Sequence, residues 1–140
     1  MKPTVHVIAT TADGTRAALA AAAPLARGVG ASLVVLVPHI VSSPAELEMP
    51  VGSAAALVRR YEEMARALGA DATVEIVASV GLRDLVARAC AVRSRIVVGG
   101  PVGRWLTSPE ERFANRLAAC GCSVLFAASG RNTTQRRVAA

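Results

Sequence analysis

Residues 97–109, with the sequence VVGGPVGRWLTSP, run from an apolar segment through three glycines toward a helix start. Ser108 followed by Pro109 is typical of a helix N-terminus, because serine caps the first turn and proline fits the first helical position. The acidic pair Glu110 and Glu111 suits the positive end of that helix. A strand, a glycine loop and a helix in this order begin like a loop that holds phosphate.

The rest of the chain repeats the alternation of strand and helix. The segments that are apolar and of strand length are 5–9, 33–37, 73–77, 95–98 and 123–127. Helical periodicity or composition falls between them, at 16–27, 57–68, 82–90 and 109–120. This order predicts a single doubly wound α/β domain, with a five-stranded, mainly parallel sheet and helices on both faces.

Turn-rich and polar segments mark the limits of this domain. The strand at 33–37 is predicted to end at Pro38, and the strand at 73–77 to lie outermost because its apolar residues alternate. The stretch 41–52 carries two prolines and is predicted to be a mobile loop. The domain is predicted to span residues 1–128, and the basic segment 129–140 to be a disordered tail.

Composition limits the location and chemistry of the protein. The chain of 140 residues is 53% apolar, yet it contains no apolar run long enough to cross a bilayer and no secretory signal at its N-terminus, which predicts a cytoplasmic protein. Cys90, Cys120 and Cys122 show neither CxxC spacing nor a disulfide framework, so we expect small core residues in a reducing compartment. A redox pair at Cys120 and Cys122 is the alternative, which we favour less.

The net charge of +6 raises nucleic acid or an anionic ligand as a partner. All basic residues except Lys2 are arginines, scattered along the chain without interleaved aromatic residues. Solvated helix faces therefore explain the charge better than a nucleic-acid surface, and a basic nucleic-acid-associated protein stays as a minor alternative.

Catalytic and metal-binding patterns are missing from the sequence. His6 lies within the first strand, where a satisfied core histidine is the simpler interpretation, and His39 stands alone at a strand end. Neither histidine has Cys, Asp or Glu at metal-ligand spacing. No nucleophile and base pattern occurs, so we do not predict an enzyme, a metal or a required cofactor.

Nearly the whole chain, from Val5 to Ala127, resembles the universal stress protein family. The likeness is carried by AALAAAAPLARGVGASLVVLV at residues 17–37, IVVGGPVGR at 96–104 and CSVLFA at 122–127. The resemblance implies the fold of the adenine nucleotide alpha hydrolases. Family members that bind ATP carry Gly, two residues, Gly, nine residues, then Gly and Ser or Thr, together with an aspartate after the first strand.

This chain departs from both parts of that motif. Gly100 and Gly103 supply its first half, but Phe113 and Ala114 stand in the second half, or Glu111 and Arg112 if the loop is two residues shorter. Neither alignment restores the motif, and a glutamate would face phosphate with the wrong charge. Thr10 replaces the aspartate, and we expect the nearby Asp13 to cap the following helix.

The residues that still suit a nucleotide or anion site are Thr10, Gly99, Gly100, Gly103, Arg104 and Ser108. The leading hypothesis is a non-enzymatic regulatory protein of the universal stress protein type, which dimerises, binds an unknown protein partner and has weak or no affinity for ATP. The alternative is a sensor of an adenine nucleotide or cyclic dinucleotide that uses the altered loop from Gly100 to Gly103.

A homodimer is predicted through the closing strand, from Ser123 to Ala127. That strand is expected at a sheet edge, where unpaired backbone groups must be covered. In the family this strand commonly pairs with its counterpart, so the resemblance implies the same contact.

Overall fold

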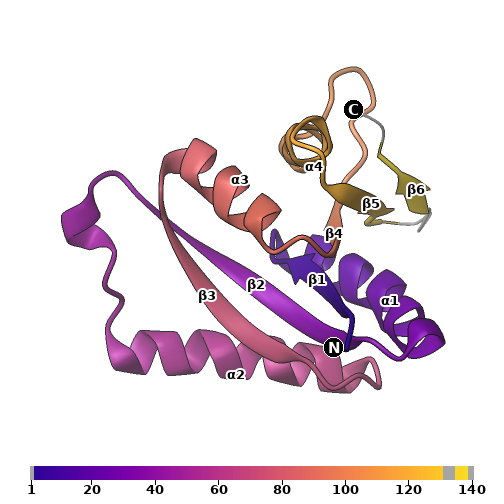
Figure 1. The fold of residues 1–140 in the computed structure, drawn as a ribbon, viewed down its shortest axis with the longest axis horizontal. Helices are drawn as coiled ribbons and strands as arrows, with labels where there is room; N and C mark the ends of the chain where they lie inside the picture. Colours follow the sequence, from indigo (N-terminus) through magenta and orange to yellow (C-terminus); the bar gives the residue numbers. More distant parts are fainter. Residues whose placement is uncertain (1, 131–134, 139–140) are drawn as a thin grey trace.

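The computed structural model describes residues 2–130 and 135–138, which form an α/β domain (Figure 1). Its elements in chain order are β1 (Thr4–Ile8), α1 (Ala12–Val29), β2 (Ser32–Val41), the 3-10 turn η1 (Pro44–Glu46), α2 (Val51–Ala67), β3 (Thr73–Val80), α3 (Gly81–Ala91), β4 (Arg95–Gly100), α4 (Pro109–Ala119), β5 (Ser123–Ala128) and β6 (Gln135–Arg137). The sheet order is β3-β2-β1-β4-β5-β6, and every pairing is parallel except that of β5 with β6. The predicted doubly wound α/β fold is confirmed.

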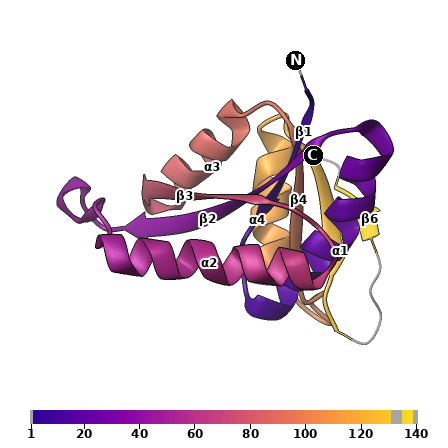
Figure 2. The same cartoon turned by 90° about the horizontal axis from the view of Figure 1, so that it is seen from below.

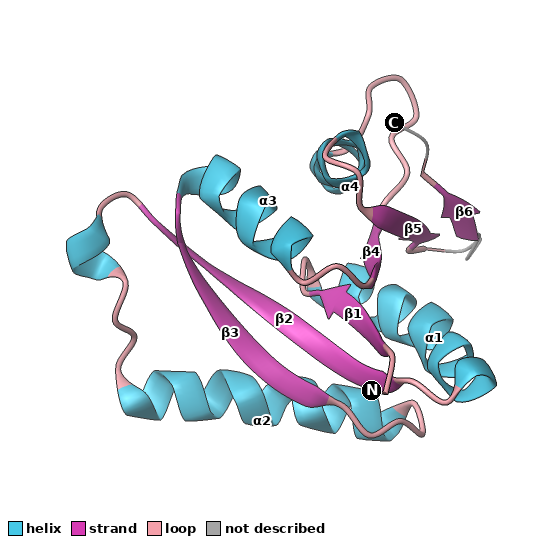
Figure 3. Cartoon of the chain, in the orientation of Figure 1, coloured by secondary structure: helices cyan, strands magenta, loops and turns pink. Residues whose placement is uncertain are grey.

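Helices α1 and α2 cover one face of the sheet, and α3 and α4 cover the other (Figures 2 and 3). Val7 and Val35 point into one core with α1 and with Tyr61 of α2. Ile8 points into the opposite core, which holds side chains of α3 and α4 such as Leu117. Successive strand residues face opposite sides of a sheet, so strands buried on both faces need the continuous apolar runs that the sequence contains.

Strand β2 does not end at Pro38 as predicted but continues to Val41. Pro38 pairs in register with Val77 of β3, whereas β1 reaches only Leu36 of β2. Beyond that point no strand among the described residues pairs with this side of β2, so the missing amide hydrogen of proline costs no hydrogen bond within the sheet. The paired arm of β2 and β3 thereby extends past the other strands (Figure 1).

Two helices begin earlier than the sequence predicted. Helix α1 starts at Ala12, four residues before the predicted start at Arg16, with Thr11 as its N-cap. Helix α2 starts at Val51, so the end of the predicted loop 41–52 is helical, and η1 interrupts the remainder. Both differences add helical turns at the carboxyl ends of β1 and β2.

The edge beyond β5 is occupied, which corrects the expectation that β5 is an edge strand. Strand β6 pairs antiparallel with β5, and the Val138 amide donates to the Val124 carbonyl over 3.0 Å. Part of the predicted disordered tail is therefore a strand, while residues 131–134 and 139–140 lie outside the described residues. A returning segment satisfies the backbone groups that an edge leaves open.

The expectation that all three cysteines are reduced core residues is wrong. Cys90 and Cys122 form a disulfide with a Cα–Cα distance of 5.8 Å, and Cys120 is free and exposed. The pair is 32 residues apart in sequence, and the packing of α3 against α4, which precedes Cys122, brings it together.

Within residues 2–130 and 135–138, no helix has the length and apolar character that a membrane crossing demands.

Candidate functional site

The loops that follow β1 and β4 meet at the carboxyl edge of the sheet, where such folds bind ligands. Gly14 of α1 and Gly99 of β4 touch: a Cβ atom on Gly99 would lie 1.9 Å from the Gly14 carbonyl oxygen. The Thr10 hydroxyl donates to the Gly99 carbonyl over 2.6 Å. Thr10 and Gly99 thus lie in contact, and their hydrogen bond joins the loop before α1 to β4.

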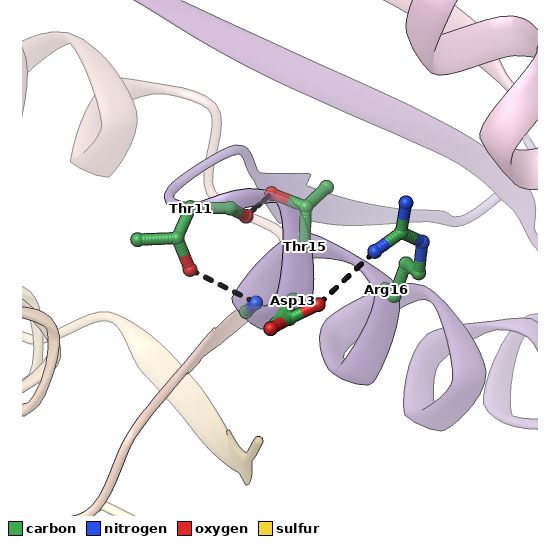
Figure 4. A network of polar contacts seen from close by, with 5 residues as sticks. Thr11, Asp13, Thr15 and Arg16 are labelled. Carbon is green, nitrogen blue, oxygen red and sulfur yellow. Dashed lines mark hydrogen bonds and ion pairs between the residues drawn. The ribbon is translucent and has the colours of Figure 1, made fainter. Parts of the chain in front are cut away.

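The first turn of α1 is held by threonine hydroxyls (Figure 4). Thr11 accepts a hydrogen bond from the Gly14 amide at 3.0 Å, and the buried Thr15 hydroxyl donates to the Thr11 carbonyl at 2.8 Å. The expectation that Asp13 caps the helix is wrong, because Thr11 is the N-cap. The Asp13 carboxylate makes an exposed ion pair with Arg16 at 3.0 Å. Asp13 therefore does not replace the absent aspartate of the nucleotide-binding motif.

The loop after β4 folds onto the carboxylate of Glu111. Its Oε1 accepts hydrogen bonds from the Gly103 amide at 2.7 Å and the Ser108 amide at 2.9 Å, while the Ser108 hydroxyl accepts from the Glu111 amide at 3.1 Å. The pair Ser108 and Glu111 forms a capping box, and the Glu111 side chain is buried. Amides that suit an anion are bonded here to a carboxylate of the chain itself.

The other loop residues serve packing or lie in solvent. A Cβ on Gly103 would lie 1.6 Å from the Leu106 carbonyl oxygen, so glycine is required for the turn. A Cβ on Gly100 would lie 2.6 Å from Cβ of Glu110. Arg104 and Trp105 are exposed, with Trp105 93% accessible. The structure therefore does not gather the six predicted residues around one ligand-sized space.

A pocket of about 530 Å³ opens beside this loop, between α3 and α4. Its wall is mostly apolar, with polar groups from the first loop and from α4. The lining residues are Ile8, Ala9, Thr10, Thr11, Pro38, Ile40, Leu82, Leu85, Pro109, Glu110, Arg112, Phe113 and Arg116. A concave apolar pocket with a few polar groups is the usual form of a small-molecule site.

Glu110 lines the pocket, and one oxygen of its carboxylate, Oε2, is buried without a donor among the described residues. A buried carboxylate oxygen without a donor is unfavourable, so rotation of the Glu110 side chain toward a ligand N–H or O–H group would satisfy it.

Sequence reasoning missed both glutamates as site residues. The spacing Ser108-x-x-Glu111 is the sequence signature of a capping box and could have located the Glu111 carboxylate near the loop. No sequence signal pointed to Glu110, because its burial depends on the packing of α4 against Gly100.

Two side chains elsewhere have shifted pKa values. Burial lowers the pKa of His6, which contacts Ser94, and the charge of Glu75 opposes this shift. Hydrogen bonds from the Val80 amide and Arg88 lower the pKa of Asp84 at the start of α3. Among residues 2–130 and 135–138, no three His, Cys, Asp or Glu side chains are grouped to hold a metal ion.

The molecule is a doubly wound α/β protein with a pocket at the carboxyl ends of its strands. Solved structures of universal stress proteins share this architecture. One in complex with cAMP is 24% identical, with 92% of this chain and 98% of that chain covered and a TM-score of 0.64. The sequence matches no family model and no curated protein.

Two structures from Archaeoglobus fulgidus agree. A universal stress protein is 19% identical over 90% of this chain and 93% of that chain, with a TM-score of 0.62. Another, in complex with dAMP, is 18% identical over 93% and 98%, with a TM-score of 0.60. The chain therefore has the fold of the universal stress proteins.

Proposed function

We propose that this protein is a non-enzymatic regulatory protein of the universal stress protein type that has lost ordinary affinity for Mg-ATP. The observation that carries the proposal is the Glu111 carboxylate bonded to the Gly103 and Ser108 amides. A triphosphate bound at this loop would have to displace that carboxylate.

The energy of this exchange is unfavourable in two ways. Each hydrogen bond to a charged oxygen contributes roughly 1.5–3 kcal/mol, and the two amides already donate to Glu111. A phosphate near the carboxylate would also meet like charge. Loss of a few such bonds moves a micromolar site to about millimolar or weaker.

Calorimetric titration of the full chain with Mg-ATP tests the proposal. We expect no saturation up to about millimolar nucleotide, the weak regime that lost phosphate contacts predict. Glu111→Ser removes the occupant and frees two donors, so we expect roughly tenfold to hundredfold tighter binding of ATP than in the wild type.

Glu110→Ser is the matched control, because it removes a neighbouring carboxylate that bonds no loop amide among the described residues. Circular dichroism of each variant verifies that it is folded. Saturation of the wild type at low micromolar ATP would overturn the proposal.

A second candidate function is an adenine-nucleotide or cyclic-dinucleotide sensor that uses the apolar pocket. It is supported by the volume of about 530 Å³, by the unpaired Glu110 oxygen and by the cAMP and dAMP complexes of proteins with the same fold. A nucleotide with one phosphate requires less of the loop than ATP does. Equilibrium dialysis with cAMP and AMP tests this candidate, and Leu85→Trp, which fills the pocket, should abolish binding.

We propose in addition that the protein is cytoplasmic and acts through an unknown protein partner and a homodimer. Because β6 covers β5, pairing of two copies through Ser123 to Ala127 requires β6 to leave. Sedimentation of the full chain and of a version ending at Ala128 measures whether β6 opposes the dimer. Salt-dependent retention on DNA or RNA would instead favour the nucleic-acid alternative.

A further inference from the structure

The three cysteines line one hollow, which shares no lining residue with the apolar pocket between α3 and α4. The hollow has a volume of about 550 Å³ and lies at the amino ends of β4 and β5. Cys90 belongs to α3 and Cys122 directly precedes β5. Their Cα–Cα distance of 5.8 Å lies within the usual range for disulfides.

The third cysteine is placed beside this bond. Cys120 ends α4, is exposed, and is separated from Cys122 only by Gly121. Gly121 has φ of 91°, a conformation that glycine adopts without strain and that turns the chain sharply. The free thiol of Cys120 therefore lies two residues from Cys122 and lines the same hollow as the disulfide.

The groups around the disulfide favour the release of Cys90 as a thiol and the approach of a negatively charged reagent. Cys90 Sγ lies 3.9 Å from the Leu117 carbonyl oxygen, so a Cys90 thiol has an acceptor for its S–H group. Arg93 and Arg95 line the hollow and are exposed. Positive charge at the mouth of a cleft raises the local concentration of anions.

We propose that this hollow is a thiol–disulfide exchange site for negatively charged low-molecular-weight thiols, with Cys120 as the exchanging residue. The Cys120 thiolate attacks Cys122 Sγ, a Cys120–Cys122 bond forms, the Cys90–Cys122 bond breaks, and Cys90 leaves as a thiolate that takes up the proton lost by Cys120. No oxidant or reductant is consumed in this step.

The small thiol reacts in the next step. Its thiolate attacks Cys120 Sγ in the exposed Cys120–Cys122 bond, which forms a mixed disulfide and releases Cys122 as a thiol after protonation. A second molecule then attacks the mixed disulfide and frees Cys120. In sum, two small thiols are oxidised to one small disulfide, and one protein disulfide is reduced to two thiols.

The exchange would change how α3 is attached. In the disulfide form Cys90 ties the last turns of α3 to β5, whereas the Cys120–Cys122 form leaves α3 held by packing alone. Leu82 and Leu85 at the other end of α3 line the apolar pocket, so the site can influence that pocket through one helix.

Peptide mapping after rapid alkylation tests the exchange in the oxidised full chain. We expect wild type held at pH 8 to yield both Cys90–Cys122 and Cys120–Cys122 peptides, with Cys90 alkylated in the second form. Cys120→Ser should lose the second linkage and retain the first. Because Cys120 is exposed, we expect this variant to give the circular dichroism spectrum of the wild type.

Reduction rates test the class of thiol. In each protein we compare the rate of reduction by 2-mercaptoethanesulfonate with the rate of reduction by 2-mercaptoethanol at low salt. We expect this ratio of rates to be about tenfold higher in the wild type than in the Arg93→Gln/Arg95→Gln variant. The exchange would be overturned if the oxidised protein contained no disulfide or only the Cys90–Cys122 linkage. Equal rates of reduction in wild type and Cys120→Ser would also overturn it. Equal thiol preference in the arginine variant would overturn the charge selectivity.

Discussion

Glu110 and Glu111 are adjacent in the first turn of α4, yet their carboxylates meet opposite conditions. Glu111 is buried beneath the loop and bonded to two amides, whereas Glu110 faces the apolar pocket with a buried oxygen that no described residue partners. The Glu111 carboxylate completes the hydrogen bonding of the loop, whereas the Glu110 carboxylate retains a buried oxygen without a donor among the described residues.

The difference shows where the fold has room for a ligand. Neighbouring helix residues point about 100° apart, so one turn of α4 closes the glycine loop and lines the pocket at the same time. The Gly103 and Ser108 amides are hydrogen-bonded to the Glu111 carboxylate, whereas the apolar pocket beside the loop is open. A search for ligands should therefore begin with small apolar or aromatic molecules that carry a hydrogen-bond donor, rather than with triphosphates.

Glu111→Ala breaks the comparison most strongly. It leaves the Gly103 and Ser108 amides without this acceptor in a buried place, so we expect a loss of roughly 2–4 kcal/mol of unfolding free energy. Urea unfolding measures the loss. Glu111→Gln retains a neutral acceptor and should lose less; equal stability of wild type and Glu111→Ala would show that the carboxylate does not hold the loop.

Gly100→Ala tests the contact that positions Glu110. A new Cβ would lie 2.6 Å from both Cβ and Cγ of Glu110, and overpacking of this kind costs about 1–3 kcal/mol. Gly28→Ala is the control, because nothing lies within 4 Å of its Cβ and alanine favours the helix. Thermal unfolding should shift in opposite directions for the two variants, and a stabilised Gly100→Ala would contradict the described packing.

Glu110→Gln sharpens the comparison at the buried Glu110 oxygen. Replacement of a carboxylate whose buried oxygen lacks a donor should leave stability unchanged or raise it by up to about 1 kcal/mol. Chemical unfolding of the two proteins in parallel measures this. A clear loss of stability would mean that Glu110 is satisfied in solution.

His6 is a third titratable side chain in the interior, and we expect its replacement to change the unfolding free energy least. Burial lowers its pKa below 6.5, so the unfolded chain binds the proton more readily than the folded one. Stability should therefore be complete above pH 6.5 and fall as the pH drops through that value, until the folded-state pKa is passed. His6→Gln should flatten this part of the stability profile; an unchanged slope would assign it to other groups.

The sequence was sufficient for the alternation of strands and helices along the chain because each central strand is a continuous apolar run such as 33–37. It failed where tertiary context decides. Pro38 stays in β2 because one side of the strand is vacant there, and β6 forms in a segment without apolar alternation. Local patterns contain neither fact.

The candidate site was predictable to a similar degree. The break in the nucleotide motif was visible at Glu111, but the occupation of the loop by its carboxylate required the folded geometry. Gly99 and Gly100 were expected near a ligand, and instead they allow Gly14 and Glu110 to approach. Glycine permits close approach of any group, so sequence alone does not tell a ligand from a helix.

The contact between Gly14 and Gly99 also determines how the pocket can move. With backbone atoms touching and Thr10 hydrogen-bonded to the Gly99 carbonyl, the loop after β1, from which Thr10 and Thr11 line the pocket, is held against the end of β4. Leu82 and Leu85 of α3 line another side of the pocket, and Leu82 is partly exposed. Breathing of the pocket should therefore be a swing of α3 against a fixed frame, and probes of its motion belong on that helix.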